Sequence, residues 1–137
     1  MMLSYDLTIV GGGMVGLTLA ASLAKSDLNI AIIENSEASA LSEAPATRVS
    51  AISAASRTIF ETIGAWQGIN EKRITAYDTM YVWEKDSFGK IAFDAQQVDA
   101  IQLGYIIENE QIQHALTQTV KKQKNVTFYA PDKLSNI

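Results

Sequence analysis

The sequence predicts an α/β fold built on a parallel sheet, and three features near its amino terminus carry that prediction. An apolar run at Tyr5–Val10 precedes a glycine-rich turn, an apolar segment at helical spacing over Met14–Lys25, and a second apolar run at Ile30–Ile33. Such runs are typical of strands buried on both faces, and a strand, a helix and a strand within about thirty residues form a βαβ unit. This order predicts a Rossmann-like domain.

After the βαβ unit, the sequence predicts a loop over Ser36–Thr47 and then a helix over Ser53–Ile63. The loop is rich in Ser, Ala and Glu, contains one proline and lacks an apolar period. Ser53 can cap the start of the helix, and Gly64 suits the left-handed position just after its end.

The second half of the chain predicts an inserted β-hairpin, a helix and a third parallel strand. The hairpin strands are Thr79–Trp83 and Lys90–Phe93, separated by a polar, glycine-containing turn. A helix over Glu110–Lys122 and a strand over Val126–Tyr129 follow. We expect residues 1–137 to be the amino-terminal part of a nucleotide-binding domain, with the sheet incomplete at its carboxyl end and the substrate domain absent.

The amino-acid composition excludes several classes of function. The 137 residues are 47% hydrophobic and carry a net charge of −4, without the basic surplus that nucleic-acid binding uses. The chain has no cysteine, so disulfides and thiolate sites are excluded, and the cytoplasm is the expected compartment. His114 has neither a neighbouring cysteine nor a facing serine, so we expect no metal site and no nucleophile there. We also expect no catalytic acid or base among these residues. Three aromatic residues are expected in the core: Trp66, Tyr81 and Trp83.

The glycine-rich turn carries the first functional motif. Gly11, Gly13 and Gly16 have the spacing G-x-G-x-x-G between a strand and a helix. In such motifs the first glycine allows a tight turn, the second lets a pyrophosphate approach the backbone, and the third lets helix and strand pack closely. The free amides of the helix start, at Met14 and Val15, would face the phosphates. The sequence therefore predicts a dinucleotide site.

Glu34 ends the second apolar run, eighteen residues after Gly16. A carboxylate at this place can accept both hydroxyls of an adenosine ribose and repels a 2′-phosphate, whereas the alternative is a solvated acid at a strand end. Asn35 follows as a candidate neighbour of the same ligand. FAD and NAD both fit these features.

Three later blocks of sequence favour FAD over NAD, because they resemble a family of FAD-dependent enzymes. Arg48–Ser53, Ile63–Trp66 and Leu103–Asn109, in this order, resemble the ubiquinone-biosynthesis hydroxylases, which are FAD-dependent monooxygenases, and the resemblance covers essentially the whole chain. It implies that Arg48 lies near FAD, where a guanidinium can bind phosphate oxygens in bidentate fashion. It also implies that Asn109 contacts the ribityl or pyrophosphate region, although Asn109 can equally cap the helix that follows.

For the activity, the resemblance implies that NAD(P)H reduces FAD and that an electron-rich polyprenyl phenol is hydroxylated on its ring. Asn35 stands where some related hydroxylases carry arginine, and the family's later Asp-Gly and Gly-Asp motifs do not occur, so we expect no turnover from these residues alone. The alternatives are an NAD-dependent dehydrogenase domain and a truncated, non-catalytic nucleotide-binding or interaction module. A homo-oligomer, a quinone-synthesis assembly and peripheral attachment to the inner membrane stay open for the parent protein.

Overall fold

The computed structural model describes residues 3–37 and 40–135, which form an α/β domain with two sheets and a hairpin. In chain order the elements, with η for a short 3-10 helix, are β1 (Leu7–Val10), α1 (Met14–Ser22), β2 (Ile30–Ile33), β3 (Val49–Ser53), α2 (Ala54–Thr62), η1 (Trp66–Gly68), η2 (Glu71–Arg73), β4 (Ile74–Tyr77), β5 (Thr79–Trp83), β6 (Lys90–Asp94), η3 (Ala95–Val98), β7 (Gly104–Glu108), α3 (Asn109–Lys121) and β8 (Val126–Tyr129).

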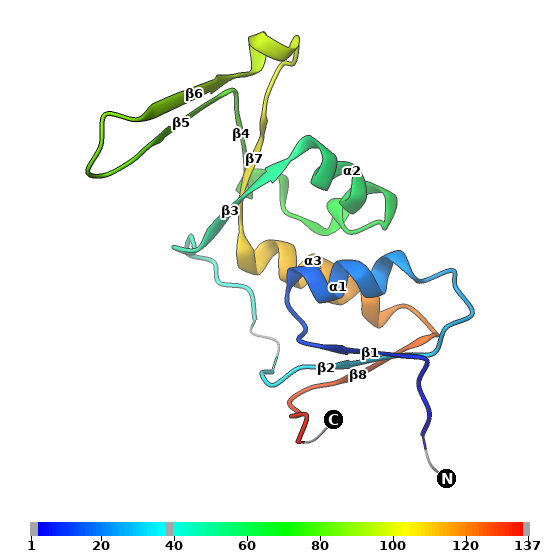
Figure 1. Cartoon of the computed structure of the whole chain (residues 1–137). Coiled ribbons are helices and arrows are strands. Elements are labelled where there is room, and N and C mark those ends of the chain that lie inside the picture. The colour runs from blue at the N-terminus through cyan, green and yellow to red at the C-terminus, as the bar shows by residue number, and fades with distance from the viewer. Residues whose placement is uncertain (1–2, 38–39, 136–137) are drawn as a thin grey trace.

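The parallel sheet has the order β1-β2-β8, as the three apolar runs predict. Ile30 of the central strand lies opposite Leu7 on one side and Val126 on the other. The helices α1 and α3 lie side by side over one face of this sheet (Figure 1). The Rossmann-like prediction is therefore confirmed, and the carboxyl end of β1 leads directly into the glycine turn.

The second sheet is antiparallel, with the order β3-β7-β4, and the sequence analysis did not predict it. Strand β3 begins at Val49, directly after Arg48, and Val49 lies opposite Glu108 of β7. Gly104 allows close pairing at the other end, because a Cβ there would lie 2.3 Å from the carbonyl oxygen of Ile52. The blocks Arg48–Ser53 and Leu103–Asn109 thus contain neighbouring strands, and their pairing brings Arg48 and Asn109 to one end of this sheet.

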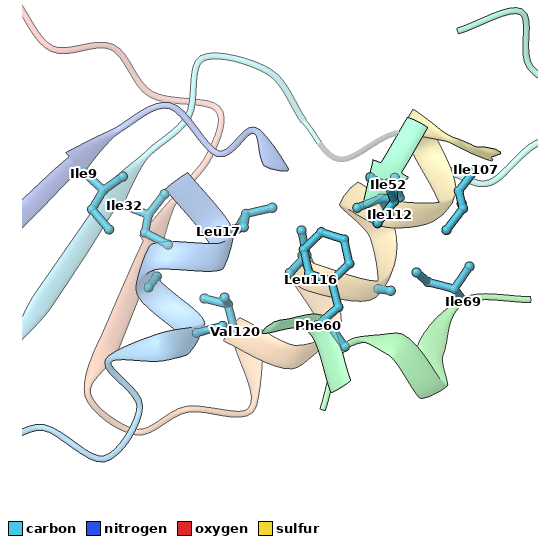
Figure 2. Packing of buried hydrophobic residues seen from close by; sticks show 14 of the residues in the cluster. Ile9, Leu17, Ile32, Ile52, Phe60, Ile69, Ile107, Ile112, Leu116 and Val120 are labelled. Atoms are coloured by element: carbon cyan, nitrogen blue, oxygen red, sulfur yellow. The ribbon is translucent and has the colours of Figure 1, made fainter. Parts of the chain in front are cut away.

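One hydrophobic core joins the two sheets. Ile9 and Ile32 of the parallel sheet lie beside Leu17 of α1, and the cluster continues through Leu116 of α3 to Phe60 of α2 (Figure 2). Further α3 residues, Ile112 and Val120, extend the same cluster. Because α3 contacts the parallel sheet and the second layer together, it fixes how the glycine turn sits relative to β3 and β7.

The packing of α1 differs from the prediction. Helical spacing predicts an inward stripe of Val15, Leu19, Ala20 and Leu23, and of these Ala20 is buried and Leu23 packs against the core. Val15 and Leu19 instead face outward, with Val15 84% exposed, while Leu17 is buried. Nearly every residue of α1 is apolar or small, so helical periodicity cannot select the buried face. The helix also ends at Ser22 rather than Lys25.

The aromatic residues of the hairpin are also placed differently from the prediction. Tyr81 and Trp83 are 69% and 73% exposed, because two strands alone leave both faces open (Figure 1). Trp66 does pack against the core, edge-to-face with Tyr105 at 5.3 Å between ring centroids. Within residues 3–37 and 40–135, no helix has the length and apolar character needed to cross a membrane.

Candidate functional site

The glycine turn has the backbone geometry that its spacing predicts. Gly11 follows β1 with φ of 108°, a conformation that favours glycine, and its amide donates to the carbonyl of Ile33 at 2.8 Å. A Cβ on Gly16 would lie 2.3 Å from the carbonyl oxygen of Gly11, so the helix can approach the turn this closely only with glycine there.

The start of α1 presents an open donor surface. Gly13 is the N-cap of α1, it is exposed, and a Cβ built on it would meet no atom within 4 Å. The amides of the first turn, including Met14 and Val15, have no intrahelical carbonyl to bind. These amides and the positive end of the helix dipole form a surface suited to an anionic group beside Gly13.

The Glu34 carboxylate lies against this turn. Its Oε2 accepts a hydrogen bond from the Gly12 amide at 2.6 Å, and its Oε1 accepts one from the Ser36 amide at 2.8 Å. The Ser36 and Gly12 amides hold the pKa of Glu34 below its ordinary value, so the side chain is a carboxylate at neutral pH. Each carboxylate oxygen can accept a further hydrogen bond, and Asn35 beside it is exposed.

Arg48 and Asn109 lie together at the end of the antiparallel sheet. The Asn109 amide donates to the Arg48 carbonyl at 3.0 Å, and Ser50 Oγ donates to Asn109 Oδ1 at 2.6 Å. Asn109 is the first residue of α3, and Glu108 is its N-cap, so the capping alternative for Asn109 is wrong. The Arg48 side chain is exposed.

Gln113 of α3 contacts the glycine turn, and the sequence analysis missed it. Its Nε2 donates to the Gly12 carbonyl at 2.9 Å. Since Asn109 and Gln113 are four residues apart on α3, they lie on the same face of that helix. Glu34 therefore holds Gly12 at its amide, and Gln113 holds the same residue at its carbonyl.

A second missed feature is the ion pair of Arg73 with Glu108. Both contacts are 2.6 Å, from Arg73 Nε and Nη2 to the two carboxylate oxygens, and the pair is mostly buried. Glu108 also accepts from the Ala46 amide at 2.7 Å, while Arg73 donates to the carbonyls of Glu43 and Ala44. The Arg73 guanidinium has the largest effect in lowering the pKa of Glu108, and the Ala46 amide lowers it further. The pair holds the loop that leads to Arg48 against the antiparallel sheet.

An open depression of about 570 Å³ lies elsewhere, beside η1, η2 and α3. Arg73, Gln111 and His114 line part of it, and none of the predicted site residues does. The candidate site is instead an extended surface at the carboxyl ends of β1 and β2, which is where dinucleotides bind in open α/β sheets.

Comparisons with known proteins agree with this geometry. Residues 9–41 match the family described as an NAD(P)-binding Rossmann-like domain. The chain is 35% identical over 131 residues to 3-demethoxyubiquinol 3-hydroxylase of Escherichia coli, covering 94% of this chain and 33% of that protein. It is 37% identical over 124 residues to the human ubiquinone biosynthesis monooxygenase COQ6, covering 85% of this chain and 26% of that one. Over most of its length, the chain is therefore similar to ubiquinone-biosynthesis hydroxylases.

The chain spans about a third or less of the length of these relatives. Among solved structures, a probable FAD-dependent monooxygenase of Pseudomonas aeruginosa, PqsL, superposes with a TM-score of 0.64 at 15% identity, covering 91% of this chain and 32% of that one. The p-nitrophenol 4-monooxygenase PnpA of Pseudomonas putida gives 0.61 at 17% identity, covering 89% and 30%. At these identities the likeness shows that this chain shares their fold.

Proposed function

We propose that this chain forms the nucleotide-binding part of an FAD-dependent, NAD(P)H-consuming monooxygenase that hydroxylates the ring of a polyprenyl phenol in ubiquinone biosynthesis. The observation that carries the proposal is the hydrogen bond from Gln113 to the Gly12 carbonyl, which places α3, the helix that begins at Asn109, against the glycine turn. The relatives' names supply the substrate class. Because the chain spans a third of them, we assign to it only the binding of the nucleotide.

The residues present fit the pyrophosphate of such a cofactor. The space beside Gly13 is open, whereas a Cβ at Gly12 or Gly16 would meet protein atoms within 3.1 Å or less. Phosphate oxygens placed there would accept from the amides of Met14 and Val15. The exposed Arg48 guanidinium can add a bidentate contact to the same phosphates.

The residues also fit the adenosine end. Glu34 is ionised and already fixed by the Gly12 and Ser36 amides, so it can accept ribose hydroxyls without losing side-chain entropy on binding. Its charge disfavours a 2′-phosphate at the same place. Asn35 and Asn109 are the polar residues that we assign to the rim of the nucleotide.

Bound FAD would supply the redox chemistry of the hydroxylation. This chain's residues contribute binding and orientation: the glycine turn fixes the pyrophosphate, Glu34 fixes the ribose, and Gln113 keeps the Gly12 peptide in the orientation that exposes the next amides. We assign no proton transfer to any residue of this chain.

A nucleotide-binding domain of an NAD-dependent dehydrogenase is the second candidate, favoured by the match of residues 9–41 to NAD(P)-binding domains. NAD and FAD share the adenosine diphosphate that the glycine turn and Glu34 would hold. The two functions differ at Arg48 and Asn109, which lie outside that match.

Parallel calorimetric titrations with FAD and NADH test the proposal. We expect Arg48→Ala to weaken FAD binding roughly tenfold or more, since a charge-assisted phosphate contact contributes about 1.5–3 kcal/mol. FAD should bind more tightly than NADH to the wild-type chain, and Lys72→Ala, which changes an exposed lysine on η2, should alter neither affinity. Preferential binding of NADH, unaffected by Arg48→Ala, would favour the dehydrogenase and contradict the proposal.

We also propose that the protein works in the cytoplasm and meets its prenylated substrate at the surface of the inner membrane. A polyprenyl tail partitions into lipid because each buried methylene contributes about 0.8 kcal/mol. Flotation of the parent protein with vesicles containing a polyprenyl phenol checks this: we expect recovery with substrate-loaded vesicles, and equal recovery with bare vesicles would argue against it.

A further inference from the structure

The end of β7, the central strand of the antiparallel sheet, lies beside the segment that enters β3. Strand β4 pairs with β7 on one side, which brings Arg73, the residue before β4, to Glu108 at the end of β7. Strand β3 pairs on the other side, and its first residue, Val49, lies opposite Glu108. We call residues 43–48, which lead into β3 and end at Arg48, the strap.

The buried ion pair holds the backbone of the strap. Arg73 donates to the carbonyls of Glu43 and Ala44 at 3.3 and 3.2 Å. Glu108 accepts from the Ala46 amide at 2.7 Å. The strap contains neither a helix nor a strand, so no regular ladder fixes its path. Its path therefore depends on these three hydrogen bonds.

The chemistry of the ion pair suits this task better than it suits stabilising the sheet. The side chains of Arg73 and Glu108 are 17% and 10% exposed. Removing two charges from water costs free energy that their attraction returns only in part, so a buried ion pair is a weak source of stability. Apolar side chains could fill the same space, but they could not bind backbone groups. A guanidinium that binds a carboxylate twice still has donors for carbonyls, and the carboxylate can still accept from an amide.

The strap passes this restraint on to Arg48. The Arg48 carbonyl accepts from the amide of Asn109, which directly follows Glu108, at 3.0 Å. The backbone of Arg48 is thus fixed at its own carbonyl and, two residues earlier, at the Ala46 amide. A side chain on a fixed backbone loses less conformational entropy when it binds a ligand.

We propose that Arg73 and Glu108 are positioning residues of the nucleotide site, which hold the strap so that Arg48 presents its guanidinium to the pyrophosphate. Neither residue touches the nucleotide. The inference rests on the proposed function, in which Arg48 binds phosphate oxygens of FAD. Loosening the strap lowers FAD affinity, because Arg48 must then be ordered on binding, and it has no such effect once the Arg48 side chain is removed.

A double-mutant cycle of Arg73→Lys with Arg48→Ala, followed by calorimetric titration with FAD, tests this coupling. Lysine keeps the positive charge but lacks the planar fork that reaches both the carboxylate and the strap. Arg73→Lys should weaken FAD binding roughly threefold or more in the wild-type background and less than about twofold in the Arg48→Ala background. Arg57→Lys makes the same change in the more exposed ion pair with Glu61 and should leave the affinity unchanged.

A second variant guards against a failure of folding. Glu108→Gln keeps one acceptor oxygen where the carboxylate has two, and it should show the same dependence on Arg48. Urea unfolding shows whether each variant is folded. Equal losses of FAD affinity with and without the Arg48 side chain would overturn the inference, and so would loss of folding in both variants, because the ion pair would then serve the fold as a whole.

Trypsin digestion with mass spectrometry tests the strap without any nucleotide. Cleavage after Arg48 should be roughly threefold faster or more in Arg73→Lys than in the wild type, because a loosened strap opens more often. Cleavage after Lys85, in the exposed hairpin turn, should keep its wild-type rate and is the internal control. Unchanged cleavage after Arg48 would overturn this inference even where FAD binds. A wild-type chain that binds no FAD would contradict the proposed function, and this inference with it.

Discussion

The βαβ unit and the hairpin contain strands of similar length and apolar content, yet one is buried and the other is exposed. Ile30 and Ile32 of β2 are fully buried, because β2 has a strand on each side and two helices over one face. Trp83 of β5 is 73% exposed, because within residues 3–37 and 40–135 the hairpin has two strands and no covering layer. The number of neighbouring elements, rather than apolar content, therefore decides burial in this chain.

The largest expected effect separates binding from folding within the glycine turn. Gly13→Val should abolish nucleotide binding while the chain stays folded, because the space beside Gly13 is open to the ligand and free of protein atoms. Gly16→Ala should instead destabilise the fold by about 1–3 kcal/mol, because its Cβ would collide with the Gly11 carbonyl. Calorimetric titration and urea unfolding measure the two effects, and normal affinity in Gly13→Val would remove this glycine from the site.

A pair of truncations tests the contrast in burial directly. Leu17→Ala in α1 should lower the free energy of unfolding by about 2–5 kcal/mol, since Leu17 is fully buried. Trp83→Ala removes a larger side chain from the hairpin and should change stability by no more than about 0.5 kcal/mol. Urea denaturation at low protein concentration measures both, and equal losses would contradict the contrast.

Glu34→Ala should weaken FAD binding by about 1.5–3 kcal/mol, if its carboxylate accepts the ribose hydroxyls. Glu37→Ala removes an exposed acid nearby and serves as the matched control. Because the pKa of Glu34 is below its ordinary value of 4.5, the wild-type affinity should not fall through loss of this charge between neutral pH and about pH 5. Titration at both pH values checks this. Unchanged affinity in Glu34→Ala would mean that Glu34 is only a solvated acid at a strand end and not a ribose ligand.

The same carboxylate gives a pH dependence of stability with a defined sign. A lowered folded-state pKa means that the contribution of Glu34 is complete above the unfolded value and is lost as the pH falls through the folded value. In Glu34→Ala, the difference in stability from wild type should therefore shrink below about pH 4.5. A constant difference across acid pH would show that the charge plays no part.

The smallest expected effect on binding is that of Gln113→Ala, which should lower FAD affinity by about 0.5–1.5 kcal/mol through the loss of one hydrogen bond to the Gly12 carbonyl. Gln118→Ala, an exposed glutamine on the same helix, is the control. A loss of stability without a change in affinity would mean that Gln113 only holds α3 in place.

The sequence predicted the parallel sheet because each of its features is local. Gly11, Gly16 and the run Ile30–Ile33 act within one βαβ unit, so spacing alone identifies them. The same holds for Ser53, whose hydroxyl accepts from the Ser56 amide as a cap, and for Gly64, whose φ is 78°. Local chemistry therefore predicted the glycine turn and both ends of α2.

The missed features depend on partners far apart in the sequence. Gln113 contacts a carbonyl 101 residues away, and Arg73 pairs with Glu108 across 35 residues. Glu108 directly follows two isoleucines at the end of an apolar block, which is a signal that a buried acid needs a partner, but nothing local identifies Arg73. The exposed faces of α1 and of the hairpin were misjudged for the same reason, since burial is set by elements elsewhere in the chain.

The central claim is that this chain holds the adenosine–pyrophosphate end of FAD, and competition between FAD and ADP tests it most directly. After dialysis against FAD, the visible spectrum should show weak flavin binding that ADP displaces and FMN does not. ADP should bind nearly as tightly as FAD, because both present the same groups to Gly13 and Glu34. A stoichiometric flavin band that ADP cannot displace, or no binding of either nucleotide, would contradict the account.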